Sequence, residues 1–119
     1  MSIYKKDSLA RAIAAIVAAG GSDAREAKLV AENLVTANLT GHDSHGVGMI
    51  PRYIDSLLEG GLVVNQHPKI MFDGGAMLSL DGQAGYGQVI GLEAMEIGIA
   101  RAKQHGMCVM GLGRAHHLC

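Results

Sequence analysis

The second half of the chain reads as a strand, a helix and a strand, in that order. Apolar runs at residues 77–80 and 107–110 flank a helical pattern at residues 87–104, which Gly106 ends. Each run is too short for a helix, so both are predicted to be strands. Two strands joined by a helix lie parallel in one sheet, and this order therefore predicts a βαβ unit.

A unit of this kind needs other elements to cover it. Parallel strands are normally buried on both faces. A single βαβ unit without further strands or helices leaves them partly open. We therefore expect this chain of 119 residues to be the N-terminal part of a longer protein.

A β-hairpin is predicted immediately before the βαβ unit. Residues 69–72 form a third short apolar run, and Asp73-Gly74-Gly75 separates it from the run at 77–80. Such Asp-Gly and Gly-Gly pairs are strong hairpin signals, because tight turns need residues that tolerate positive φ.

Helical spacing predicts three helices in the first half, over residues 7–19, 22–38 and 51–58. Apolar residues recur there at intervals of three and four, as one buried helix face requires. Ser22 is the predicted N-cap of the second helix, and Pro51 suits the first turn of the third. The expected fold class is α/β, with a helical N-terminal segment followed by a β-hairpin and a βαβ unit.

Two domains or segments are expected along the chain. Residues 1–66 form the helical N-terminal segment, and residues 67–119 form the hairpin and the βαβ unit. The boundary is placed where helical spacing gives way to short apolar runs.

Composition excludes several function classes. The formal net charge is -1, and charged residues make up only 18% of the chain. No basic stripe is present, and aromatic residues amount to 3%, so a nucleic-acid partner is not expected. No apolar run approaches the ~18–20 residues that span a bilayer, so no membrane partner is expected either. Cys108 and Cys119 do not make a disulfide framework, which fits a reducing, cytoplasmic setting.

The densest group of chemically active side chains lies in residues 41–47 and 51–53, which read GHDSHGV and PRY. Histidine titrates near neutrality and suits proton transfer. Glycines on both sides place this cluster on a turn between two helices. On chemistry alone the cluster fits a metal site, a hydrolase or a dehydrogenase.

The metal and hydrolase alternatives have weak local support. His42 and His45, with Asp43, His116, His117 and Cys119, supply enough ligands for zinc or iron. The usual C-x-x-C or H-x₃-H spacing is absent. Ser44 lacks the G-x-S-x-G elbow of a hydrolase nucleophile, and adjacent side chains rarely face each other.

A glycine-rich turn precedes the helix of the βαβ unit. Gly85, Gly87 and Gly91 resemble a pyrophosphate-binding fingerprint, but Ile90 occupies the third-glycine position. No acidic residue follows the next strand for a ribose contact, although Arg114 would suit a 2′-phosphate. The alternative is a glycine-rich turn with one close helix–strand contact.

Taken in order, several motifs resemble the malate/L-lactate/ureidoglycolate dehydrogenase family, the lactate dehydrogenases without a Rossmann fold. The resemblance is closest to the hydroxycarboxylate dehydrogenase branch and runs along almost the whole chain. The matching motifs are Ser44-His45-Gly46-Val47, Pro51-x-Tyr53, Leu80-Asp81-Gly82, Gly87-Gln88 and His117. The resemblance implies that residues 67–119 begin a non-Rossmann nucleotide-binding domain and that the glycine turn is not a pyrophosphate cradle.

The resemblance implies an NAD- or NADP-dependent interconversion of small 2-hydroxy and 2-oxo acids, in a homodimer when the protein is full length. His117 is the implied proton-transfer residue. His45 is the second implied catalytic residue and also a cofactor-binding one, because it matches a family histidine close to the nicotinamide and the substrate. Ser44 and Tyr53 match positions that line the substrate pocket.

Two positions depart from the family pattern. Met49 stands where many members have an arginine for the substrate carboxylate, and Arg52 is the nearby candidate to replace it. Cys119 stands at a cofactor-binding position that is usually glycine, where a Cβ hinders close approach. The chain is therefore expected to be the N-terminal part of a 2-hydroxyacid dehydrogenase, inactive alone. The alternative is a non-catalytic binding or oligomerisation module on the same scaffold.

Overall fold

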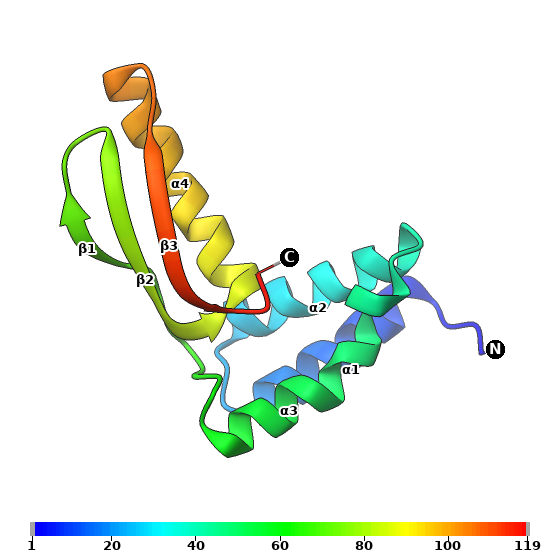
Figure 1. The fold of residues 1–119 in the computed structure, drawn as a ribbon. Helices are drawn as coiled ribbons and strands as arrows, with labels where there is room; N and C mark the ends of the chain where they lie inside the picture. Colours follow the sequence, from blue (N-terminus) through cyan, green and yellow to red (C-terminus); the bar gives the residue numbers. More distant parts are fainter. Residues whose placement is uncertain (1, 119) are drawn as a thin grey trace. The chain divides into compact units, whose positions relative to one another are not determined.

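A computed structural model describes residues 2–118 of the chain. The chain divides into two compact units, a helical unit that ends at Asn65 and a sheet unit that begins at Gln66. Figure 1 shows the helices of the first unit and the sheet and helix of the second. The fold class is mixed α/β, as predicted.

Three α-helices and two short 3-10 turns form the helical unit. The elements are α1 (Lys6–Ala19), α2 (Ala24–Leu39), η1 (Asp43–His45), η2 (Val47–Met49) and α3 (Ile50–Glu59). The three predicted helices are confirmed to within two residues at each end. Pro51 lies in the first turn of α3, as expected, and Gly60 ends this helix in the left-handed conformation at φ 85°.

The apolar faces of α1 and α2 supply buried side chains. Val17, Val30 and Leu34 are completely buried, and Ile13 is 6% exposed. These residues fall on the stripes that the sequence spacing predicted. Each such side chain stabilises the fold by about 1.5–3 kcal/mol through removal of its apolar surface from water.

The N-cap of α2 is Asp23, so the prediction of Ser22 was wrong. Asp23 Oδ1 accepts a hydrogen bond from the Glu26 backbone N–H at 2.8 Å. Ser22 lies one residue earlier, and its hydroxyl donates to Glu26 Oε2 at 2.6 Å. Asp and Ser are both good N-caps, and the buried Glu26 carboxylate decides between them by taking the Ser22 hydroxyl.

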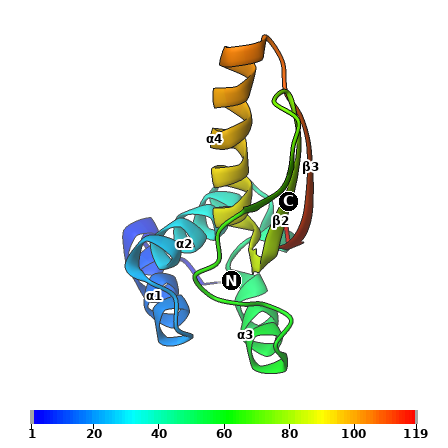
Figure 2. The ribbon, with the colours of Figure 1, turned by 90° about the vertical axis from the view of Figure 1, so that its left-hand side faces the viewer.

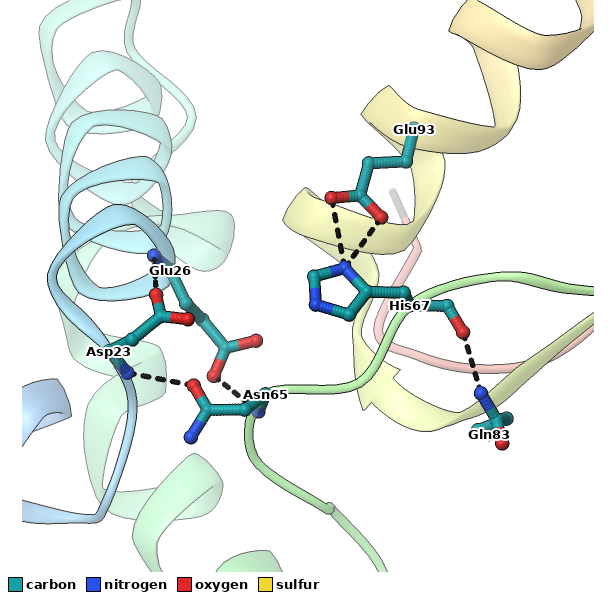
Figure 3. A network of polar contacts seen from close by, with 6 residues as sticks. All are labelled: Asp23, Glu26, Asn65, His67, Gln83 and Glu93. Atoms are coloured by element: carbon teal, nitrogen blue, oxygen red, sulfur yellow. Dashed lines mark hydrogen bonds and ion pairs between the residues drawn. The ribbon is translucent and has the colours of Figure 1, made fainter.

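Asn65 closes the helical unit by bonding back to the turn between α1 and α2. Its side chain accepts from Asp23 N at 2.7 Å and donates to Gly21 O at 2.9 Å, and its backbone N–H donates to Glu26 Oε2 at 2.8 Å. Figure 3 shows the bonds among Asp23, Glu26 and Asn65. Asn65 has φ 58°, and asparagine tolerates this left-handed conformation better than most residues.

The sheet unit contains β1 (Lys69–Asp73), β2 (Met77–Tyr86), α4 (Gly87–His105) and β3 (Val109–His116). The strand order is β1-β2-β3, with β1 antiparallel to β2 and β2 parallel to β3. The predicted hairpin and βαβ unit are therefore both confirmed. Helix α4 runs along one face of this sheet (Figure 2), and it ends at Gly106 with φ 86°.

Strands β2 and β3 extend further than the apolar runs predicted. β2 continues past Asp81 to Tyr86, and β3 continues to His116. The pairing register shifts between Asp81 and Gly85 and then resumes, with Tyr86 opposite His116. Pairing with β3 is interrupted between Asp81 and Gly85 and resumes at Gly85. The strand therefore continues beyond the point where the side-chain pattern of a strand ends.

His67 joins the start of the sheet unit to its helix and strand. Its Nδ1 lies 2.9 Å from Glu93 Oε2 on α4, and its carbonyl accepts from Gln83 Nε2 at 2.7 Å (Figure 3). Among residues 2–118, no helix is long and apolar enough to cross a membrane.

Candidate functional site

The predicted site residues fall into two clusters, one in each unit. Ser44 and His45 lie in the helical unit, and His116 and His117 lie at the end of β3 in the sheet unit. Cys119, the predicted cofactor-binding position, lies outside the described residues.

Ser44 and His45 form a hydrogen-bonded pair in the η1 turn. Ser44 Oγ lies 2.9 Å from His45 Nδ1, and both residues are exposed. The expectation that these adjacent side chains would not face each other was therefore wrong. The reason is local, because a tight 3-10 turn brings neighbouring side chains closer together than an extended backbone does. The pair offers an imidazole and a hydroxyl for binding or proton transfer.

His42 stands next to this pair. Its ring centroid is 6.4 Å from that of His45, and the rings are nearly perpendicular at 77°. No group of three or more His, Cys, Asp or Glu side chains that could hold a metal ion occurs in residues 2–118.

The turn is held by Asn38, a residue that the sequence did not single out. Asn38 Nδ2 donates to Asp43 Oδ1 at 2.8 Å, and Asn38 Oδ1 accepts from the Val47 backbone N–H at 2.8 Å. These bonds fix the two ends of the segment that contains Ser44 and His45.

The other candidates in the helical unit differ in exposure. Tyr53 is buried in α3 with 3% exposure, whereas its neighbour Arg52 is exposed. Met49, at the position where arginine was expected from the family resemblance, is half-buried at the end of η2.

His116 and His117 contact each other through their Nδ1 atoms, which lie 2.7 Å apart. The ring centroids are 4.2 Å apart. A hydrogen bond between two Nδ1 atoms needs one protonated and one unprotonated nitrogen, so the two rings must differ in their protonation at Nδ1. His117 adopts φ 54°, an uncommon conformation for a residue other than glycine.

The backbone of His117 lies directly against the first residue of α4. A Cβ on Gly87 would come within 2.6 Å of His117 O and 2.7 Å of Leu118 N. A Cβ on Gly91 would similarly meet Leu118 Cδ1 at 2.5 Å. The protein's own chain therefore fills the space at these glycines, which does not fit a bound pyrophosphate at this turn.

A bidentate ion pair lies at the register shift just before the histidines. Arg114 Nε and Nη2 donate to Asp81 Oδ1 and Oδ2 at 2.9 and 2.8 Å. Asp81 Oδ1 also accepts from Gln83 N at 2.8 Å. The Arg114 bonds, with the Gln83 N–H, lower the pKa of Asp81 to about 2. Sequence reasoning missed this role for Asp81 and Arg114, which lie 33 positions apart.

Backbone strain gathers at the same place. Gln83, Ala84 and Arg114 have φ values of 55°, 60° and 53°. Left-handed backbone at residues other than glycine costs of order 1–3 kcal/mol each and is concentrated at functional sites. The end of β3 is therefore a strained, braced segment that carries His116 and His117.

The family follows from comparison with known proteins. The family model described as malate/L-lactate dehydrogenase matches residues 4–119. The chain belongs to the malate/L-lactate dehydrogenase family. Hydroxycarboxylate dehydrogenase B of Escherichia coli K12 is 50% identical over 98 residues, which is 82% of this chain and 27% of that protein. Malate dehydrogenase of Pyrococcus horikoshii is 39% identical over 114 residues, covering 94% of this chain and 31% of that protein.

Solved structures agree with this family assignment. A proposed malate/lactate dehydrogenase of E. coli matches with TM-score 0.94 and 43% identity, over 99% of this chain and 33% of that one. Sulfolactate dehydrogenase of Methanocaldococcus jannaschii matches with TM-score 0.91 and 34% identity, over 98% and 34% of the two chains. The chain thus spans about a third of the length of the family members that it matches.

Proposed function

We propose that this chain is the part of an NAD(P)-dependent 2-hydroxyacid dehydrogenase that carries its proton-transfer histidine. The whole enzyme would interconvert a small 2-hydroxy acid and the corresponding 2-oxo acid. Family membership supports the reaction class, because the relatives' names include malate, lactate and sulfolactate dehydrogenases. The observation that carries the proposal is the geometry at His117.

His117 has the features that a general acid–base residue needs. Its imidazole is oriented by the Nδ1 contact with His116, and its backbone is seated on Gly87. A partner at one ring nitrogen fixes the tautomer and the direction of the other. In the oxidation direction His117 would take the proton from the substrate hydroxyl, and in the reduction direction it would return the proton to the carbonyl oxygen.

The Ser44–His45 pair is proposed to contact the nicotinamide end of the cofactor and the substrate. Both side chains are exposed and polar, which fits a hydrogen-bonding role toward an amide or a hydroxy acid. When bound, NAD(P) supplies the acceptor or donor of the hydride. The chain's own backbone fills the space at Gly87, which argues against a pyrophosphate at this turn. The choice between NAD and NADP is therefore not expected to rest on that turn.

Arg52 and Tyr53 complete the proposed substrate-binding set. Arg52 is exposed at the start of α3, and its guanidinium can bind a carboxylate through two hydrogen bonds. Arg52 would thus take the role of the arginine that many family members have at the position of Met49. Tyr53, which is buried, would hold the start of α3 and line the pocket from within.

The proposal extends to the assembly and its setting. The whole enzyme is proposed to be a homodimer, from the family resemblance, in the cytoplasm, from the sparse cysteine content. The isolated chain is proposed to be inactive, because it spans only about a third of its relatives.

Two measurements test this function. NADH fluorescence titration of the 119-residue protein should show no binding tighter than millimolar, and micromolar binding would overturn the proposed inactivity of the chain alone. A chimera in which residues 4–118 replace the matching segment of E. coli hydroxycarboxylate dehydrogenase B should oxidise 2-hydroxy acids with NAD(P). A folded chimera without turnover would contradict the proposed chemistry.

A further inference from the structure

Asn38 uses both ends of its carboxamide on the turn that carries Ser44 and His45. Its Nδ2 donates to Asp43 Oδ1 and its Oδ1 accepts from Val47 N–H, each at 2.8 Å. Asp43 and Val47 also determine which way the Asn38 carboxamide is oriented. The Asp43 carboxylate accepts hydrogen bonds and the Val47 N–H donates them, so only one orientation of the amide satisfies both.

Gly46 provides the space that this arrangement needs. A Cβ at Gly46 would overlap the Asn38 carboxamide. The Gly46 backbone is extended, with φ -95° and ψ -154°, so its conformation does not itself require glycine. Position 46 therefore requires glycine because the Asn38 carboxamide packs against it. This close packing is evidence, separate from the hydrogen bonds, that the turn holds Asn38 in place.

We propose that Asn38 is the positioning residue for His45. Its bonds fix Asp43 and Val47, and the segment between them contains the Ser44–His45 hydrogen bond. With both ends of this short segment held, the backbone that aims the His45 ring has little freedom. The positioning of His45 by Asn38 follows from the geometry alone. Its importance for catalysis rests on the proposed function.

The chemistry of the two contacts calls for an amide at position 38. A carboxylate there can accept from Val47 N–H but cannot donate to Asp43, and it places two negative charges at hydrogen-bond distance. The Asn38→Asp variant should therefore release the turn. Adding Asp43→Asn reverses the donor and acceptor, because the new amide donates to the new carboxylate, which still accepts from Val47.

The test is a mutant cycle read by NMR on the ¹⁵N-labelled 119-residue protein. The readouts are the ring ¹⁵N shift of His45 Nδ1 and the hydrogen exchange rate of the Val47 amide. Asn38→Asp should shift the Nδ1 signal and accelerate Val47 exchange roughly tenfold, the loss expected for one hydrogen bond. Asp43→Asn should resemble the wild type, because Asn38 can still donate to the new amide oxygen.

The double variant Asn38→Asp/Asp43→Asn tests whether Asn38 positions His45. Recovery of the wild-type His45 shift supports positioning by Asn38. A double variant that resembles Asn38→Asp, or an Asn38→Asp protein that resembles the wild type, would overturn it. Exchange of the Leu34 amide in the core of α2 reports global folding, and if Asn38→Asp unfolds the chain, the double variant must restore the fold.

The same cycle in the E. coli chimera separates this inference from the proposed function. Asn38→Asp should lower kcat by roughly 10- to 100-fold, the cost of misplacing a reacting group, and Asp43→Asn should restore it. If the NMR signals recover in the double variant but turnover never changed, Asn38 positions the turn and His45 has no role in turnover. Loss of the NMR effect overturns the positioning role itself.

Discussion

Arg114 and Asp81 form a bidentate ion pair at the point where the regular pairing of β2 and β3 is interrupted. Pairing resumes one residue after Arg114, with Ala115 opposite Gly85, and His116 follows. The ion pair thus stabilises the strained backbone segment that leads into His116 and His117.

This ion pair predicts the titration of Asp81. Its pKa is lowered from an ordinary value of 3.8 to about 2, first by the Arg114 hydrogen bonds. The folded-state pKa lies below the unfolded one. The stabilisation of the fold by the ionised Asp81 carboxylate is therefore fully present above about pH 4, and it is lost as the pH falls through about 2.

Carboxyl ¹³C shifts measured against pH should show an Asp81 midpoint near 2. In Arg114→Gln the midpoint should return toward 3.8, while the Asp73 carboxyl, which lies at the end of β1 and pairs with Arg101, should keep its low pKa. An unchanged Asp81 midpoint in Arg114→Gln would show that the Gln83 N–H and the Lys69 charge, and not Arg114, lower the pKa of Asp81.

A second prediction concerns the contact between Gly87 and the His117 backbone. Gly87→Ala should destabilise the protein by about 1–3 kcal/mol, because the Cβ forces backbone apart. The matched control is Gly98→Ala in the same helix, where a Cβ meets only the Met110 side chain, with Cε at 3.5 Å. Alanine there should stabilise by about 0.5–1 kcal/mol through helix propensity. Urea unfolding of both variants measures this difference, and two stabilised variants would mean that His117 does not rest on Gly87.

A third prediction concerns Asn65, which closes the helical unit. Asn65→Ala removes its two side-chain hydrogen bonds and places alanine at φ 58°, so it should cost about 2–3 kcal/mol of unfolding free energy. Asn65→Gly removes the same bonds but accepts the left-handed backbone, so it should cost roughly 1 kcal/mol less. Equal losses by thermal unfolding would show that the hydrogen bonds, and not the backbone conformation, make Asn65 necessary.

The sequence predicted the regular elements well because their ends carry local signals. Gly60 and Gly106 stop helices in the left-handed conformation that glycine favours, and the turn at Asp73 to Gly75 joins two strands as expected. The continuation of β2 was missed because Gly82 to Gly85 break the alternation that identifies a strand. There the pairing with β3 shifts register and two residues take positive φ.

The site was predicted in part. The identities of Ser44, His45 and His117 came from motif resemblance, and their roles are still predictions. The residues that hold them in place gave no signal, because their partners are chosen by tertiary structure. Asp81 and Arg114 are far apart in sequence, and Asn38 is an ordinary polar residue in the last turn of a helix. Ser22 is another residue whose partner is chosen by its surroundings. It was predicted to cap α2, but its hydroxyl donates to the Glu26 carboxylate instead.

The central claim is that His117 transfers the proton, and turnover of the E. coli chimera tests it most directly. His117→Ala should lower kcat by roughly 10²- to 10⁴-fold, the usual contribution of general acid–base catalysis, with little change in unfolding temperature. His105→Ala, at the opposite end of α4, serves as the control and should retain full turnover. Near-normal turnover of the His117→Ala chimera would contradict the claim.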